Sequence, residues 1–155
     1  MQQGDIDACL EISVAEFGKN YHHPIYFDLK NKNHHYFVVE DSKQLIGFSI
    51  VYKVSKKEMQ KITSDSFSLS SKFYYLIDVI AIQKNKQKKG AGTSLLHKIL
   101  KVVNNEYPLY SVAWKNLNGV NIEKLYKNNN LNPIVNLGKI WAYGCNHKFQ
   151  CPSYN

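Results

Sequence analysis

The stretch Phe73–Val103, FYYLIDVIAIQKNKQKKGAGTSLLHKILKVV, decides the fold of this chain. It begins with apolar, β-prone residues (Phe73–Ile82), continues through a lysine-rich segment (Gln83–Lys89) and a Gly-Ala-Gly step (Gly90–Gly92), and ends with apolar residues at helical spacing. This order predicts a strand, a loop and a helix. Free backbone N–H groups at a helix start, together with the helix dipole, favour the binding of a phosphate group. We therefore expect an anion site at Gly90–Gly92.

The composition indicates one domain with an anionic partner. With 155 residues, of which 44% are hydrophobic, the chain can build one domain, 1–155, with its own core. Its formal net charge of +8 fits a phosphate-bearing cofactor, a nucleic acid or an acidic protein surface. No stretch approaches the roughly 20 apolar residues of a membrane span, and the N-terminus MQQGDIDACL lacks a basic start followed by an apolar run. We expect a cytoplasmic protein that does not bind membranes.

The cysteines predict neither disulfides nor a metal site. Cys9, Cys145 and Cys151 are odd in number and irregularly spaced, which is not typical of a disulfide framework. Cys145, His147 and Cys151 bring soft metal ligands close together, but a structural zinc site takes four ligands. A small metal site there stays open, while an irregular tail over 145–155 is the favoured interpretation.

Local patterns elsewhere predict the remaining helices and strands. Helices are expected over 5–17, near 24–30, 56–62 and 119–129, and strands over 34–40, 44–54, 109–114, 134–137 and 139–144. Asp41–Lys43 reads as a tight turn, and Gly47 as a position for a β-bulge. The fold class is therefore mixed α/β (α+β-like), with a mostly antiparallel central sheet of about six strands and helices on both faces.

Two motifs carry a resemblance to a known family. Gln87, Gly90 and Gly92 resemble the acetyl-coenzyme A signature Gln/Arg-x-x-Gly-x-Gly/Ala of the GNAT N-acetyltransferase superfamily. Leu125 and Tyr126 match a Leu-Tyr pair in the penultimate helix of that family. The chain lacks both the P-loop motif and the complete dinucleotide-binding fingerprint, so neither nucleotide site is indicated. The resemblance covers about residues 3–146 and implies a GNAT-type fold.

The resemblance also implies acetyl-CoA as co-substrate. The strand before the loop would pair with the pantetheine arm, and the loop and helix start would hold the pyrophosphate. The implied cofactor-binding residues are Ile80, Ala81, Ile82, Gln87, Lys88, Lys89, Gly90, Ala91, Gly92 and Thr93. The thioester would lie where this strand and the strand starting at Leu109 separate. No metal is expected.

Tyr126 and Asp78 are the candidate catalytic residues. On the resemblance, Tyr126 is the general acid that protonates the leaving thiolate; the alternative is a tyrosine of the core with a satisfied hydroxyl. Asp78 is the one charged residue between Phe73 and Ile82, and strand alternation places it on a face with Leu76, Ile80 and Ile82. It can accept the proton of the amine or bind a cationic substrate, or it can be a structural, hydrogen-bonded carboxylate.

The histidines offer a second set of candidates. On the resemblance, His22 and His23 fall in the region that builds the acceptor site, so either can face the substrate or act as a base. His34 and His35 lie at the entry to a strand and are expected to be solvated. The polar segment Ser55–Ser71 is expected to be a mobile element that sets acceptor specificity.

The resemblance implies an N-acetyltransferase that moves an acetyl group to a primary amine by direct attack in a ternary complex. The acceptor is open among a small-molecule amine, a protein amine and an aminoacyl-tRNA. A homodimer is also open, since edge strands in such folds often pair. The alternative function is a catalytically inert module that senses acyl-CoA or binds nucleic acid through its basic surface.

Overall fold

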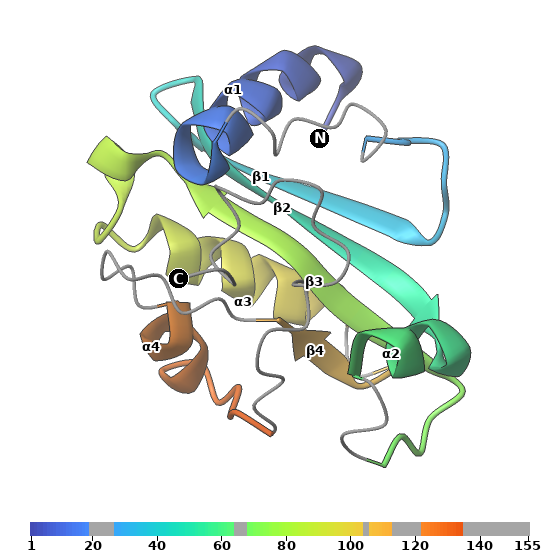
Figure 1. Ribbon diagram of the computed structural model, residues 1–155. Coiled ribbons are helices and arrows are strands. Elements are labelled where there is room, and N and C mark those ends of the chain that lie inside the picture. Colours follow the sequence, from blue (N-terminus) through green and yellow to red (C-terminus); the bar gives the residue numbers. More distant parts are fainter. Residues whose placement is uncertain (19–26, 64–67, 104–105, 113–121, 135–155) are drawn as a thin grey trace.

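The computed structural model describes residues 1–18, 27–63, 68–103, 106–112 and 122–134 (Figure 1). A short 3-10 turn, η1 (Gln3–Asp5), leads into α1 (Ile6–Phe17). The other elements are β1 (His34–Asp41), β2 (Gln44–Ser55), α2 (Lys56–Thr63), β3 (Phe73–Ile82), η4 (Lys84–Lys86), α3 (Ala91–Val103), β4 (Leu109–Ser111) and α4 (Ile122–Lys127). The mixed class predicted from the sequence is confirmed.

The strands form a single sheet in the order β1-β2-β3-β4. β1, β2 and β3 are antiparallel neighbours, and β4 runs parallel to β3. The described residues thus contain four strands rather than about six. The predicted hairpin over 134–144 lies almost wholly outside the described residues, as does the start of the predicted helix near Pro24. In the described part of this predicted helix, residues 27–30, the chain is not helical.

Two helices cover each face of the sheet. On one face, α1 packs on Phe48, Ile50, Val79 and Ala81, and Met59 of α2 packs on Tyr74 and Leu76. On the other face, the apolar side of α3 and Tyr126 of α4 pack on Val51, Tyr75 and Ile77. Figure 1 shows α1 and α3 on either side of the strands. Among the described residues, none of the helices is long and apolar enough to cross a membrane.

Local chemistry explains the elements that precede β3. The β1–β2 turn places Ser42 and Lys43 at positive φ, 51° and 66°, as a two-residue hairpin of the favoured twist requires. Ser55 and Glu58 exchange hydrogen bonds, Ser55 N–H to Glu58 Oε2 at 2.7 Å and Glu58 N–H to Ser55 Oγ at 3.3 Å, forming a capping box that starts α2. The predicted helix near 56–62 is confirmed, so a large part of Ser55–Ser71 is ordered against the sheet.

Gly47 sits beside an irregularity in the first hairpin, as the sequence predicts. Val39 pairs with Gly47 and Glu40 pairs with Leu45, so Ile46 is left without a partner on β1. A Cβ atom added to Gly47 would lie 2.6 Å from the carbonyl oxygen of Ala81 and would collide with the Ile82 side chain. Glycine at this position lets β2 approach β3 just before the loop that holds the candidate site.

Candidate active site

β3 and β4 pair over a short segment. The register pairs Tyr75 with Leu109, Leu76 with Tyr110, and Ile77 with Ser111. The N–H of Tyr75 also donates to the carbonyl oxygen of Pro108 at 2.9 Å, which anchors the start of β4. Ile77 and Ser111 are the last pair among the described residues, and residues 113–121 lie outside them. The opening predicted between the two strands would begin at this pair.

Asp78 lies in a β-bulge at this opening. Ile50 of β2 pairs with Val79, whereas Val51 pairs with Ile77, so Asp78 is the extra residue in β3. The bulge reverses the alternation along the strand. Leu76 packs with α2 on one face of the sheet, whereas Ile80 and Ile82 belong to the cluster on the other. The sequence-based prediction that Asp78 shares one face with all three is therefore wrong, because strict alternation does not survive the extra residue.

The Asp78 carboxyl group has a raised pKa because the protein partly desolvates it. Its side chain is exposed, yet the surrounding protein removes enough hydration to raise its pKa from 3.8 to about 6. Among the described residues it makes no hydrogen bond or ion pair that would stabilise the charge. A carboxylate with this pKa is largely ionised at pH 7 and can still accept a proton.

The edge of β3 beyond the bulge presents main-chain groups to the opening. Gln83 N–H donates to the carbonyl oxygen of Ile46 at 2.9 Å, which directs the main-chain groups of Gln83 toward β2. Since successive residues of a strand point their main-chain groups to opposite edges, those of Ile80 and Ile82 point away from β2. The N–H groups of Ile80 and Ile82 are therefore placed for pairing with an extended ligand.

Gln87 ties the loop to the rest of the fold. Its Nε2 atom donates to the carbonyl oxygen of Ile82 and to Glu16 Oε2 of α1, both at 2.8 Å. The sequence predicts that Gln87 binds the cofactor through its amide. Both hydrogens of that amide are donated within the protein, so Gln87 also shapes the loop.

The two glycines of the motif have different environments. Gly90 has a φ of +86°, and no atom outside its chain neighbours lies within 4 Å of a Cβ built there, so this position is open as an anion cradle requires. At Gly92, an added Cβ would lie 3.5 Å from Leu125 Cδ2, an ordinary packing distance. Gly92 therefore faces α4, and Gly90 is the glycine that the loop conformation demands.

The first turn of α3 supplies free donors beside Gly90. The Ser94 N–H donates to the Gly90 carbonyl oxygen at 2.9 Å and is the first hydrogen bond of the helix. The N–H groups of Ala91, Gly92 and Thr93 therefore have no partner within the helix. Together with exposed Lys88 and Lys89, this turn forms an electropositive start to α3.

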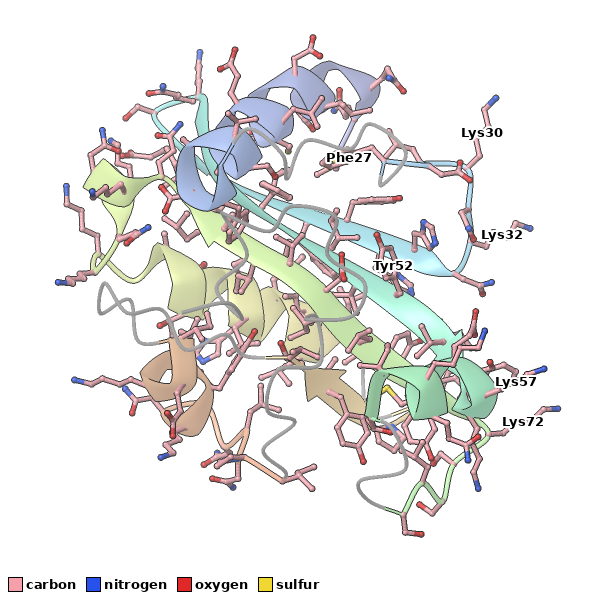
Figure 2. All side chains as sticks on the ribbon, in the orientation of Figure 1. Phe27, Lys30, Lys32, Tyr52, Lys57 and Lys72 are labelled. Carbon is pink, nitrogen blue, oxygen red and sulfur yellow. The ribbon has the colours of Figure 1, made fainter. Side chains whose placement is uncertain are left out.

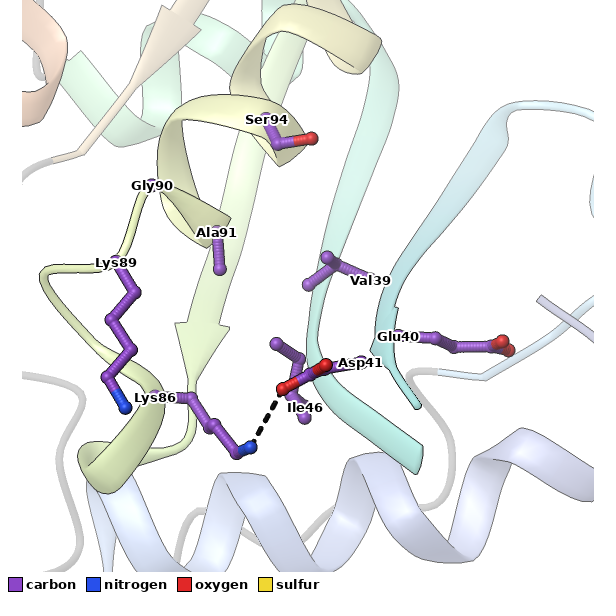
Figure 3. A pocket seen from close by; sticks show the side chains of 9 residues that line it. All are labelled: Val39, Glu40, Asp41, Ile46, Lys86, Lys89, Gly90, Ala91 and Ser94. Carbon is purple, nitrogen blue, oxygen red and sulfur yellow. Dashed lines mark hydrogen bonds and ion pairs between the residues drawn. The ribbon is translucent and has the colours of Figure 1, made fainter. Parts of the chain in front are cut away.

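An open pocket of about 460 Å³ adjoins this turn on the side of the first hairpin (Figure 3). It lies between Val39–Asp41 and Ile46 of the hairpin and Lys86, Lys89, Gly90, Ala91 and Ser94 of the loop and helix. Within it, Lys86 Nζ donates to Asp41 Oδ2 at 2.8 Å, and this hydrogen bond lowers the pKa of Asp41. The charge of Lys86 is therefore matched by Asp41, whereas Lys84, Lys88 and Lys89 of the loop make no ion pair with the described residues.

The remaining lysines do not concentrate at this loop. Lys30, Lys32, Lys57 and Lys72 project from the opposite end of the sheet (Figure 2). The net charge is therefore spread over the molecule, and the loop is identified by its main-chain geometry rather than by a lysine patch.

Tyr126 of α4 lies beside the end of the described β4 strand. It is 7% exposed and belongs to the core cluster of α3 and β3. Its Oη atom lies 2.7 Å from Ser111 Oγ, and Ser111 Oγ lies 3.3 Å from the carbonyl oxygen of Ile77. Burial raises the pKa of Tyr126, and the hydrogen bond with Ser111 opposes the increase. Tyr126 is thus a neutral, buried phenol at pH 7, hydrogen-bonded to Ser111 at the last described pair of β3 and β4.

Several of the other candidate residues lie outside the described part of the chain. These are His22, His23 and the 145–155 tail with Cys145, His147 and Cys151. Cys9 is buried, which raises the pKa of its thiol to about 12, so it is unreactive. In the described ranges, no cluster of three or more His, Cys, Asp or Glu residues could hold a metal ion.

The prediction for His34 is wrong. His34 is half-buried, its ring nitrogens contact Tyr36 Oη at 3.0 Å and Asn31 Nδ2 at 3.1 Å, and desolvation lowers its pKa. His35 packs edge-on against Tyr75. Both are part of the sheet surface, because the hairpin places them opposite aromatic residues of β2 and β3.

Comparison with known proteins gives a family. The profile described as "Acetyltransferase (GNAT) family" matches residues 6–127, which include both motifs and all of the elements around the site. The chain belongs to the GNAT acetyltransferase family. No curated protein gives a significant match.

Solved structures of family members have the same fold. An aminoglycoside acetyltransferase from an uncultured soil metagenomic sample superposes with a TM-score of 0.65 at 14% identity, covering 86% of this chain and 87% of that chain. A second such enzyme, also from an uncultured soil metagenomic sample, has a TM-score of 0.60 at 18% identity, covering 88% and 86%. The ribosomal-protein-alanine N-acetyltransferase of Brucella melitensis biovar Abortus 2308 has a TM-score of 0.58 at 15% identity, covering 88% and 91%. At these identities the likeness shows the fold.

Proposed function

We propose that this protein is an acetyl-CoA-dependent N-acetyltransferase that acts on a primary amine by direct attack in a ternary complex. One juxtaposition carries the proposal. Ile77 adjoins the Asp78 bulge, pairs with Ser111, and through Ser111 is connected to Tyr126. This connection supports a site in which a carboxyl group with a pKa of about 6 and a neutral phenol act on the same substrate.

The residues around the opening fit acetyl-CoA, which would supply the acetyl thioester. Gly90 leaves an open cradle, and the first turn of α3 offers N–H groups without helical partners, which suits a pyrophosphate. The N–H groups of Ile80 and Ile82 on the free edge of β3 suit the amides of the pantetheine arm. This fit rests on the main chain, so it depends on loop shape more than on any one side chain.

Each catalytic side chain has one task in this proposal. Asp78 accepts the proton of the attacking amine nitrogen, as the C–N bond forms. Tyr126 donates its proton to the departing sulfur, as the C–S bond breaks. The N–H of Ile80 donates a hydrogen bond to the carbonyl oxygen that gains charge. Cys9 is the one cysteine among the described residues, and it is buried and protonated. The proposed reaction is therefore direct transfer, without an acyl-enzyme intermediate.

The acceptor belongs to one of three classes. The relatives of the same fold are named for aminoglycoside and ribosomal-protein alanine acetylation, which are a small-molecule and a protein amine. Aminoacyl-tRNA is the third class, since the chain is basic. The exposed Asp78 carboxylate favours an acceptor that arrives with a positive charge.

A thiol-release screen tests the proposal. Purified protein is incubated with acetyl-CoA and polyamines, aminoglycosides, amino acids, peptides or charged tRNA, and free thiol is measured. Release with at least one class of amine, lost in Asp78→Asn, is the expected result. If acetyl-CoA raises the melting temperature while no amine releases thiol, the chain is an acyl-CoA-sensing module instead.

A further inference from the structure

The hydroxyl of Ser111 connects three elements at the mouth of the opening. Ser111 is the last residue of β4 that pairs with β3. Its Oγ atom lies 2.7 Å from Tyr126 Oη on α4 and 3.3 Å from the carbonyl oxygen of Ile77 on β3. No other described hydroxyl reaches Tyr126.

The directions of these hydrogen bonds follow from the chemistry of the partners. The Ile77 carbonyl oxygen can only accept, and serine has a single O–H, so both hydrogen bonds form together only when Ser111 donates to Ile77 and Tyr126 donates to Ser111. The bond from Ser111 to Ile77 is long for an O–H donor, whereas the contact with Tyr126 is short. The hydrogen bond from the Ser111 O–H to Ile77 is therefore weaker than the hydrogen bond from the Tyr126 O–H to Ser111.

We propose that Ser111 is the positioning residue of Tyr126, holding its hydroxyl in place at rest and turning its own O–H onto the phenolate oxygen when Tyr126 gives up its proton. This inference rests on the proposed function. In the step, the phenolic proton moves to the departing sulfur, the negative charge passes to the Tyr126 oxygen, and the Ser111 proton leaves Ile77 to hydrogen-bond that oxygen. Solvent then returns a proton to Tyr126.

The surroundings of Tyr126 make this hydrogen bond matter. The phenol is almost fully buried among apolar residues of α3 and β3, including Leu95, Leu96 and Ile77. Burial raises the pKa of Tyr126, and the hydrogen bond with Ser111 lowers it. Among the described residues, no charged side chain shifts this pKa, and this includes Asp78, which is next to Ile77 in β3. In so apolar a site, one hydrogen-bond donor is the main stabiliser of a phenolate.

The chain offers a matched control for removing this serine. Ser49 of β2 is fully buried and donates to the carbonyl oxygen of Val79 at 2.7 Å. Ser111 and Ser49 thus both donate to a β3 carbonyl oxygen, but Ser111 alone of the two contacts Tyr126. Ser49→Ala therefore reports the structural cost of losing such a bond, and Ser111→Thr keeps a hydroxyl in place.

The first experiment measures turnover against pH. In Ser111→Ala, kcat at neutral pH should fall about tenfold, which is the effect of losing one hydrogen bond to a charged group. Because the phenolate of Tyr126 loses its hydrogen-bond donor, the alkaline limb of the pH profile should also move to higher pH. The KM for acetyl-CoA should stay unchanged, and Ser111→Thr should recover most of the loss. An equal fall in Ser49→Ala and Ser111→Ala, with no shift of the alkaline limb, would overturn the proposal.

The second experiment does not depend on turnover. The protein is labelled with 3-fluorotyrosine, the Tyr126 resonance is assigned by its absence in Tyr126→Phe, and its titration is followed by fluorine NMR. The Tyr126 pKa should be higher in Ser111→Ala than in wild type and in Ser49→Ala. An unchanged titration overturns the role of Ser111, whereas wild-type protein without thiol release overturns the proposed function, so the two failures are distinguishable.

Discussion

The side-chain amide of Gln87 and the carboxylate of Glu16 are joined at 2.8 Å, linking the loop before α3 to the last turn of α1 across 71 residues of sequence. The same Nε2 atom donates to the Ile82 carbonyl oxygen, at the end of β3. Gln87 thus fixes the position at which the chain leaves the strand and turns toward Gly90. The shape of the loop therefore depends on a contact with α1, a helix that is distant from the loop in sequence.

Gln87→Leu should therefore weaken binding of coenzyme A, because it removes both hydrogen bonds that hold the loop. We expect the dissociation constant for CoA to rise about tenfold in Gln87→Leu and less in Glu16→Ala, because the Ile82 bond survives the second change. Isothermal titration with CoA measures both. Glu11→Ala, an exposed position of the same helix, is the control, and equal effects at Glu11 and Glu16 would count against the link.

Asp78→Asn should stabilise the protein in a pH-dependent way. The folded-state pKa of about 6 lies above the ordinary value of 3.8, so the folded state holds this proton more tightly than the unfolded state. The resulting stabilisation is complete below pH 3.8 and is lost as pH rises through 6. Asn has no proton to lose, so the melting temperature of the variant should exceed that of wild type above pH 6 and approach it near pH 4. A difference that does not vary with pH would show that Asp78 is not desolvated.

Tyr126→Phe should lower kcat about 100-fold, the lower end of what a general acid contributes, while the affinity for acetyl-CoA changes little. Thiol release and titration calorimetry measure the two quantities on the same protein. Tyr107→Phe is the matched control, since Tyr107 packs against Phe73 and Tyr75 away from the opening. Full turnover in Tyr126→Phe would remove the phenol from the mechanism.

Alanine at the two motif glycines should have unequal effects. Gly90→Ala forces a side chain into a φ of +86°, which costs about 1 kcal/mol or more and reshapes the anion cradle, so CoA affinity should fall sharply. Gly92→Ala adds an ordinary contact with Leu125 and should leave the melting temperature within a few degrees of wild type. Gly90→Val should abolish CoA binding. Retained affinity in Gly90→Val would contradict the assignment of the loop.

The elements predicted well are those whose signals are local. The helix expected near 56–62 is α2, the Asp41–Lys43 turn predicts the first hairpin, and the Gly-Ala-Gly step predicts the start of α3. Asn130, at a φ of 62°, follows the end of α4, which lies within the helix expected over 119–129. Each of these features depends on residues within one turn or one hairpin, so the sequence alone is sufficient.

The features that could not be predicted depend on partners distant in sequence. The bulge at Asp78 is defined by the pairing of β3 with Ile50 and Val51 of β2, and the sequence of β3 itself contains no signal for it. The contact between Ser111 and Tyr126 requires the parallel pairing of β4 with β3, which brings Ile77 opposite Ser111. Sequence patterns identified the two candidate catalytic side chains, but not the serine that lies between their elements.

The bulge has a consequence for how the strand tolerates changes in length. Asp78 is the one unmatched residue of β3 opposite β2, and the residues on either side of it already alternate between the two faces of the sheet. Deleting Asp78 should therefore turn the bulge into a regular ladder and leave Val79 and Ala81 toward α1 and Ile80 and Ile82 toward α3. Asp78 thus adds a carboxyl group to the strand without changing the packing of the residues that follow it. A homologue that is one residue shorter at this point can keep both packed layers and lose only the carboxyl group.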